Sequence, residues 1–208
     1  MTSPTITIAP LTPADIPFLP RIYFSSFAPT ALLQYNFPNV PEPGFTLWME
    51  YRMNAALDGR AQGNKGDVLV AKLGEQVAGY ASYSWFPDAK EREPGKAKRR
   101  VLPEGADERR AGDFLAKLDE QKASLRAAHY SLDNLAVAPE AQGKGVGKAL
   151  TLALLAKAKE ERVELTLEAT ELGRPLYSKM GFKDCGEPLQ GDQQPGVDIL
   201  WPMIYKSA

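Results

Sequence analysis

Hydrophobic and polar residues alternate in several short runs of the chain, and this period of two is typical of β-strands. The first such run is TITIA at 5–9, and the next two, DVLVAK at 67–72 and QVAGYASYSW at 76–85, flank the turn LGEQ. Because a short turn with glycine favours antiparallel pairing of the runs on either side, we predict an early strand followed by a β-hairpin. Four further strand patterns follow at 130–138, 163–169, 182–187 and 197–205.

Apolar residues spaced three and four apart predict amphipathic helices between these strands. The first helix follows Thr12, a suitable N-cap, with Pro13 at the first helical position and Asp15 completing a capping box. Residues 21–57 are rich in aromatic side chains and interrupted by prolines, which predicts a helix, an irregular loop and a second helix. Later helical patterns cover 113–128, 146–161 and 171–180.

Residues 86–112 are dense in charge, proline and glycine, and we predict that they form an exposed insertion. Their basic cluster, Lys96, Lys98, Arg99 and Arg100, is flanked by acidic residues, so a solvated surface segment is favoured over a contact with an acidic partner.

The composition is that of an ordinary globular chain, and 208 residues predict a single domain spanning 1–208. A net charge of −1 implies no bulk attraction to nucleic acid. The longest apolar run, at 150–156, falls well short of the roughly 20 residues that a membrane span needs. The first residues lack a secretory signal pattern. We therefore expect a cytoplasmic protein that binds neither membrane nor nucleic acid.

The chain has one cysteine, Cys185, and one histidine, His129. This excludes an intrachain disulfide and a zinc site built from cysteine and histidine, so no metal is expected. Both residues are expected to be packed or surface side chains.

A glycine-rich segment, AQGKGVGKA at 141–149, lies between a predicted strand and a predicted helix. Its glycines, Gly143, Gly145 and Gly147, would place exposed backbone at the helix N-terminus, where free N–H groups and the helix dipole favour a phosphate. The spacing fits neither the Walker loop of nucleotide-phosphate binders nor the G-x-G-x-x-G dinucleotide motif.

The segment does fit Q-x-x-G-x-G, follows LAVAPE, and precedes RPLYSKMGF at 174–182 by about thirty residues. These two motifs, in this order, resemble the signatures of the GCN5-related N-acetyltransferase (GNAT) family. The resemblance implies an α/β fold of three layers, with a central mixed, mostly antiparallel, splayed sheet of about seven strands flanked by helices. It also implies acetyl-CoA as co-substrate and direct acetyl transfer to a primary amine of a small molecule or peptide.

The resemblance assigns the donor site to two adjacent segments. The strand residues Leu135, Ala136 and Val137 would offer backbone groups to the pantetheine arm, and the N–H of Val137 would stabilise the oxyanion. The loop would bind the diphosphate through the N–H groups of residues 142–148, and Lys144 and Lys148 would add charge. The loop residues are Gln142, Gly143, Lys144, Gly145, Val146, Gly147 and Lys148.

Tyr177 takes the place of the family's general acid, which would protonate a departing thiolate with a pKa of about 8.5. Packing against the pantetheine arm is the alternative role for this side chain. An alkylammonium acceptor, with a pKa of about 10.4, must lose a proton before attack. Asp133, which shares a strand face with Ser131, and Glu168 are the two candidate bases, and a structural role remains open for both.

The aromatic segment corresponds to the part that often shapes the acceptor pocket in this family. Tyr23, Phe24, Phe27 and Tyr35, with Trp48 and Ser131, are candidates for it, with packing in the core as the alternative. Near-neutral charge favours a small amine over a histone tail. The acceptor's identity, and the choice between monomer and homodimer, stay open. A non-catalytic acyl-CoA binding module and a nucleotide-phosphate binder are the competing hypotheses.

Overall fold

The computed structural model describes residues 5–27, 30, 33–34, 37, 40–92, 101–189 and 199–206. A seven-stranded sheet forms its centre, with strand order β1-β2-β3-β4-β5-β7-β6. The first three strands, β1 (Ile6–Pro10), β2 (Asp67–Leu73) and β3 (Gln76–Phe86), are antiparallel neighbours, which confirms the predicted hairpin. Gly74, at φ +59°, supplies the left-handed residue that the hairpin turn requires.

The middle of the sheet contains its only parallel pair among the described residues, β4 (His129–Val137) and β5 (Glu164–Ala169). The pairing of β4 with β5 runs from His129 opposite Glu164 to Leu132 opposite Leu167, and β4 then continues to Val137 beside β3 alone. β5 pairs on its other side with β7 (Trp201–Tyr205), which pairs with the short β6 (Lys183–Asp184). The sheet is therefore mixed, mostly antiparallel and splayed between β4 and β5, as predicted.

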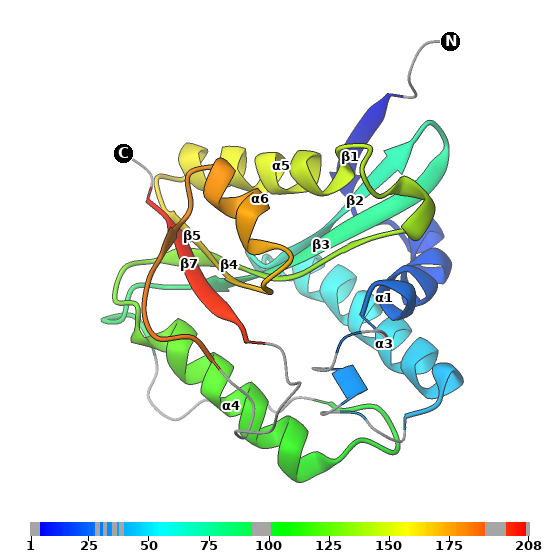
Figure 1. Ribbon diagram of the computed structural model, residues 1–208, viewed down its shortest axis with the longest axis horizontal. Coiled ribbons are helices and arrows are strands. Elements are labelled where there is room, and N and C mark those ends of the chain that lie inside the picture. The colour runs from blue at the N-terminus through cyan, green and yellow to red at the C-terminus, as the bar shows by residue number, and fades with distance from the viewer. Residues whose placement is uncertain are drawn as a thin grey trace.

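Helices cover both faces of the sheet (Figure 1). On one face, α5 (Val146–Glu160) packs against β1 to β5, and its Leu150 and Leu154 are fully buried. On the other face, η1 (Pro13–Phe18) leads into α1 (Leu19–Phe27), which packs against α3 (Glu42–Ala61) and against β3 and β4. α4 (Glu108–Ser124) lies on this second side as well. The three-layer fold is thus confirmed.

Two further short elements follow the parallel strands. η2 (Pro139–Ala141) follows β4 and leads into the glycine-rich segment, and α6 (Arg174–Lys179) follows β5. None of the helices in the described ranges is long and apolar enough to cross a membrane.

A β-bulge in β4 changes which of its side chains share a face of the sheet. Leu132 lies opposite Tyr83 and Asn134 lies opposite Ser82, so Asp133 is an extra residue without a counterpart on β3. A bulge interrupts the alternation of side chains, and Asp133 and Asn134 consequently both face α1, α3 and α4. Ser131 and Asp133 share this face, as predicted, but Asn134 joins them.

Several predicted boundaries are wrong. α4 begins at Glu108 and ends at Ser124, rather than covering 113–128, because the Asp107 carboxylate accepts a hydrogen bond from the N–H of Arg110 and caps the helix earlier. The helix predicted at 171–180 is restricted to Arg174–Lys179, and the two closing strands are shorter than 182–187 and 197–205. The cluster Lys96, Lys98, Arg99 and Arg100 lies outside the described residues, as does Tyr35.

Candidate active site

The glycine-rich segment forms an exposed loop that ends as the N-cap of α5. Gly143 and Gly145 have φ of +72° and +87°, a region that suits glycine, and Gly145 is the N-cap of the helix. No side chain caps α5, so the N–H groups of its first turn, at Val146, Gly147 and Lys148, are directed at the loop. The N–H groups of Gln142 and Lys144 already donate to carbonyls of the preceding turn. The N–H groups left without a partner in this segment are therefore those of the first turn of α5, where the helix dipole favours an anion.

Glycines also allow this loop to lie close to β4. A Cβ on Gly147 would stand 3.3 Å from Leu135 Cδ2 of β4, and one on Gly79 of β3 would stand 3.2 Å from Val146 Cγ1 at the start of α5. The start of α5 thus packs directly on the end of β4, beside the point where β5 diverges. Lys144 and Lys148 are exposed at the same end of the helix.

The backbone of β4 alternates between β3 and the splayed side. The N–H of Ala138 donates to the carbonyl of Ala78 on the β3 side, so by alternation Ala136 is also directed toward β3. Leu135 and Val137 direct their N–H and C=O groups away from β3, toward the gap that β5 leaves. The carbonyl of Val137 there accepts hydrogen bonds from Ser26 Oγ and Gln142 Nε2, each at 3.2 Å. Of the three strand residues predicted to contact the donor, Leu135 and Val137 therefore have the suitable direction.

Tyr177 lies on α6 with only 8% of its surface exposed, and its ring packs edge-on against Phe182 with 5.7 Å between centroids. Burial raises the pKa of Tyr177 to about 12. Its hydroxyl makes no hydrogen bond to any residue that the structure describes. The phenol is therefore protonated at neutral pH and has its proton available for donation.

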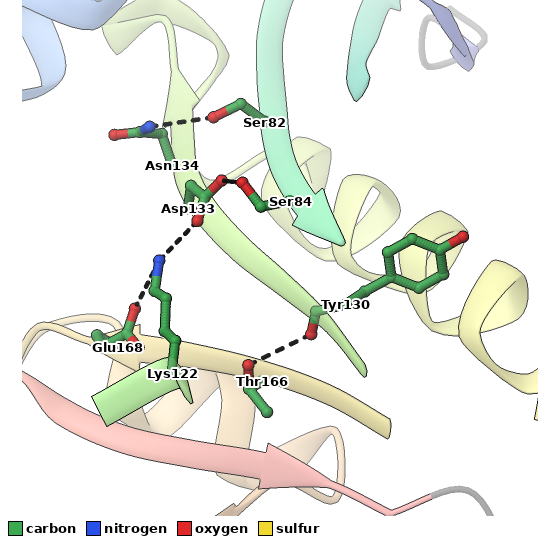
Figure 2. Close-up of polar contacts among 8 residues, drawn as sticks. All are labelled: Ser82, Ser84, Lys122, Tyr130, Asp133, Asn134, Thr166 and Glu168. Carbon is green, nitrogen blue, oxygen red and sulfur yellow. Dashed lines mark hydrogen bonds and ion pairs between the residues drawn. The ribbon is translucent and has the colours of Figure 1, made fainter. Parts of the chain in front are cut away.

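A buried polar cluster connects α4, β3, β4 and β5 on the opposite face of the sheet (Figure 2). Lys122 of α4 reaches between two carboxylates, with Nζ 2.6 Å from Asp133 Oδ1 and 3.5 Å from Glu168 Oε2. The second oxygen of Asp133 accepts a hydrogen bond from Ser84 Oγ at 2.5 Å. We call Lys122, Asp133, Glu168 and Ser84 the carboxylate cluster.

The two acids of this cluster differ in basicity. Burial opposes ionisation of Asp133, but the Lys122 ammonium and the bonds from Lys122 and Ser84 hold the pKa of its carboxyl below the ordinary value. Burial raises the pKa of Glu168, which Lys122 lowers only in part and the charge of Asp133 raises further. Glu168 is therefore the better proton acceptor, while Asp133 remains ionised and bound on both oxygens.

Sequence reasoning named Asp133 and Glu168 but missed Lys122 and Ser84. A signal for Lys122 was present, because it occupies the apolar face of its helix, four residues after Leu118 and three before Leu125, where a lysine needs a partner. Ser131, a candidate for the acceptor pocket, is fully buried, and its hydroxyl has no hydrogen-bond partner among the described residues.

The aromatic candidates gather where α1 packs on α3. Tyr23 is buried, and its ring centroid lies 4.9 Å from that of Phe27 and 6.1 Å from that of Trp48. Phe24 is half-buried and lies 6.0 Å from Phe45. These rings pack on one another as a core would, and they lie on the same face of the sheet as the carboxylate cluster. Within the described part of the chain, no group of three or more metal-ligating side chains is present.

Comparisons with known proteins agree with this arrangement. Residues 117–199 match the family model described as "Acetyltransferase (GNAT) domain". The comparison with curated proteins finds no match. Among solved structures, the chain is similar to a histone acetyltransferase HPA2 and related acetyltransferase from Corynebacterium glutamicum, with 24% identity, a TM-score of 0.61, and 100% of this chain and 98% of that chain covered.

Two further structures share the fold. Arylalkylamine N-acetyltransferase 2 from Aedes aegypti has 16% identity and a TM-score of 0.70, with 98% of this chain and 100% of that chain covered. The protein yncA from Salmonella typhimurium, whose structure includes its cofactor acetyl-CoA, has 20% identity and a TM-score of 0.57, with 98% and 94% covered. Residues 117–199 therefore match a GNAT acetyltransferase domain, and the chain as a whole shares the fold of these acetyltransferase structures.

Proposed function

We propose that the protein transfers an acetyl group from acetyl-CoA directly to a primary amine. Three observations support this proposal: the first turn of α5 has no side-chain cap, the backbone groups of Leu135 and Val137 are directed away from β3 where β5 diverges, and the buried phenol of Tyr177 on α6 is protonated. A diphosphate, an extended amide arm and a thioester need these three features in turn.

In the proposed reaction, the thioester carbonyl lies beside the end of β4. The N–H of Val137 is directed into the splay and would donate to the oxyanion of the tetrahedral intermediate, a type of contact whose loss costs about 3 kcal/mol in acyl transfer. As the carbon–sulfur bond breaks, Tyr177 would give its proton to the thiolate of CoA. Lys144 and Lys148 would add charge near the phosphates of the donor.

The acceptor amine would approach from the face that carries the carboxylate cluster. Removal of a proton from an alkylammonium at neutral pH costs about 4 to 5 kcal/mol. A nearby base with a raised pKa reduces this cost. Glu168 would take the proton, directly or through water, because its pKa is raised. Asp133 would hold Lys122 and Ser84 in position, and the free amine would then attack the thioester carbon.

Titration calorimetry with acetyl-CoA, dephospho-CoA and ATP tests the donor site before any acceptor is identified. The proposal expects micromolar binding of acetyl-CoA and weaker binding of ATP. Absence of acetyl-CoA binding would contradict the proposal, and preferential binding of ATP would favour a nucleotide-phosphate binder.

Replacement of Tyr177 by Phe then separates an enzyme from a non-catalytic acyl-CoA binding module. Turnover, measured as release of free thiol in the presence of an amine, should fall about tenfold or more with little change in acetyl-CoA affinity. Tyr205→Phe is a matched control, since Tyr205 packs on the same Phe182 ring at 5.7 Å. Equal turnover in the two variants would remove Tyr177 from the role of general acid.

A further inference from the structure

Arg52 on α3 is a cation that forms no ion pair with any described residue, and it lies on the face where the acceptor would bind. Its side chain is half-buried, and its guanidinium carbon lies 4.8 Å from the centroid of the Trp48 ring. Among the residues that the structure describes, no carboxylate lies within ion-pair distance of it. Stacking on an aromatic ring fixes the plane of the guanidinium and leaves its N–H groups at the edge available for a ligand.

Tyr80 on β3 supplies a second unpaired polar group on the same face of the sheet. The residue is fully buried, and its hydroxyl has no hydrogen-bond partner in the described part of the chain. Buried hydroxyl groups are almost always paired, so an unpaired one is a donor that a bound molecule could use. Tyr80 precedes by two residues Ser82, which bonds Asn134 on this face, so its side chain is directed to the same side as Asn134 and Asp133.

Packing connects Arg52 to this face of the sheet, because the Trp48 ring beneath its guanidinium lies 6.1 Å from the ring of Tyr23 on α1, and α1 packs on β3 and β4. Burial raises the pKa of Tyr80 and of Tyr23, and the positive charge of Arg52 opposes both increases. The same charge helps to lower the pKa of Asp133. The charge of Arg52 therefore acts on Tyr80, Tyr23 and Asp133, and all of these residues belong to the side of the sheet that α1 and α3 cover.

The charges around this region balance. Arg52 and Lys122 are cations, and Asp133 and Glu168 are carboxylates. An acceptor that carries only an ammonium would add unbalanced positive charge beside Arg52. An acceptor that carries both an ammonium and an anion would place each of them beside a group of opposite sign.

We propose that the acceptor is an amino carboxylate, whose carboxylate is bound by the guanidinium of Arg52 and the hydroxyl of Tyr80. This inference rests on the proposed acetyl transfer and specifies its substrate class. The carboxylate would accept two parallel N–H bonds from the guanidinium and one O–H bond from Tyr80. Its amine would then lie toward Asp133 and Glu168, on the side of the sheet opening where β4 carries the thioester.

Matched acceptor pairs test this assignment. Leucine, phenylalanine, β-alanine and 4-aminobutyrate are each compared with their carboxamides as acceptors of acetyl-CoA, with kcat/KM corrected for the fraction of free amine. The assays use the wild type, Arg52→Met, Tyr80→Phe and the control Arg21→Met, which changes an exposed arginine of α1. Acetyl-CoA titration of all four proteins checks the donor site separately.

At least one acid should be preferred over its amide by about tenfold or more, the range expected for a hydrogen-bonded charged group. Arg52→Met should reduce this acid-to-amide ratio by about 10- to 100-fold, whereas Arg21→Met should leave it within about twofold. Tyr80→Phe should also lower the ratio, and it should raise the melting temperature because it removes an unpaired buried hydroxyl.

Three results would overturn the assignment while leaving acetyl transfer intact. The first is equal kcat/KM values for the acids and their amides, and the second is an equal decrease in kcat/KM for acids and amides in Arg52→Met. The third is that a protein which binds acetyl-CoA acetylates none of the acids in the set. Failure of the wild type to bind acetyl-CoA would instead reject the proposed function, and the assignment with it.

Discussion

Replacing Lys122 by Met would leave two carboxylates buried together without their shared cation. Lys122 is 5% exposed and lies 2.6 Å from Asp133 and 3.5 Å from Glu168. At an effective dielectric constant of about 20, these distances correspond to attractions of about 6 and about 5 kcal/mol before the cost of desolvation. After that cost, the loss of one partner from a buried ion pair typically reduces the free energy of unfolding by about 3 to 5 kcal/mol.

The same substitution should change the pH dependence of both stability and activity. The pKa of Asp133 is lowered in the folded protein, so its stabilising contribution is present above the unfolded pKa and disappears as the pH falls through the folded pKa. The difference in stability between wild type and Lys122→Met should therefore narrow below about pH 4. Loss of the ammonium should also raise the pKa of Glu168 further, which moves the acid limb of kcat/KM to higher pH.

Urea unfolding at pH 7 and at about pH 3, with kcat/KM measured from pH 5 to 9, checks this expectation. Lys117→Met, which changes an exposed lysine on the same helix, should reduce stability by at most about 1 kcal/mol and leave the pH profile in place. Adding Asp133→Asn to Lys122→Met should recover part of the lost stability, because one of the two unpaired charges is removed. A Lys122→Met protein with wild-type stability and a wild-type pH profile would refute the reasoning.

Three other expectations follow from the structure. The value of kcat/KM should fall at acid pH with an apparent pKa above the ordinary glutamate value of about 4.3, and Glu168→Gln should abolish this decrease. Tyr177 has a pKa of about 12, so its ionisation should not lower kcat/KM below about pH 11. Glu161→Gln should lower the free energy of unfolding by about 1 to 2 kcal/mol at pH 7 and by less near pH 2. The reason is that hydrogen bonds from Lys157, Lys65 and the Tyr130 hydroxyl outweigh the effect of burial and lower the pKa of Glu161 to about 2. Thermal melts at the two pH values measure this difference. Gly79→Ala should lower the free energy of unfolding by about 1 to 3 kcal/mol, since its Cβ would stand 2.6 Å from a backbone oxygen of β4. A melting temperature equal to that of the wild type would contradict this close packing.

The order of strands and helices was largely predictable because each element carries its own periodicity. The hairpin formed by β2 and β3 and the helix α5 follow directly from local patterns. The position of the glycine loop followed from its place between a strand and a helix, which the structure confirms at Gly145. Boundaries such as the start of α4 at Glu108 depended on a single capping carboxylate, Asp107, whose effect a hydrophobic pattern does not contain.

The arrangement of side chains at the site was less accessible from the sequence. The bulge at Asp133 depends on how β4 pairs with β3, and it alone brings Asn134 onto the same face as Asp133. The pairing of Lys122 with two acids joins α4, β4 and β5, so no local window contains it. The direction of Ala136 toward β3 likewise depends on the hydrogen-bonding register, which the period of two leaves undetermined.

The central claim, that the first turn of α5 binds the diphosphate of acetyl-CoA, is tested most directly by one added charge. Gly145 is the N-cap of α5 at φ +87°, and aspartate and asparagine both tolerate this conformation and suit the N-cap position. Titration calorimetry with acetyl-CoA should show that Gly145→Asp binds at least about tenfold more weakly than Gly145→Asn, because the carboxylate repels the phosphates in the positive end of the helix dipole. Equal affinities of the two variants would contradict a diphosphate site at this helix.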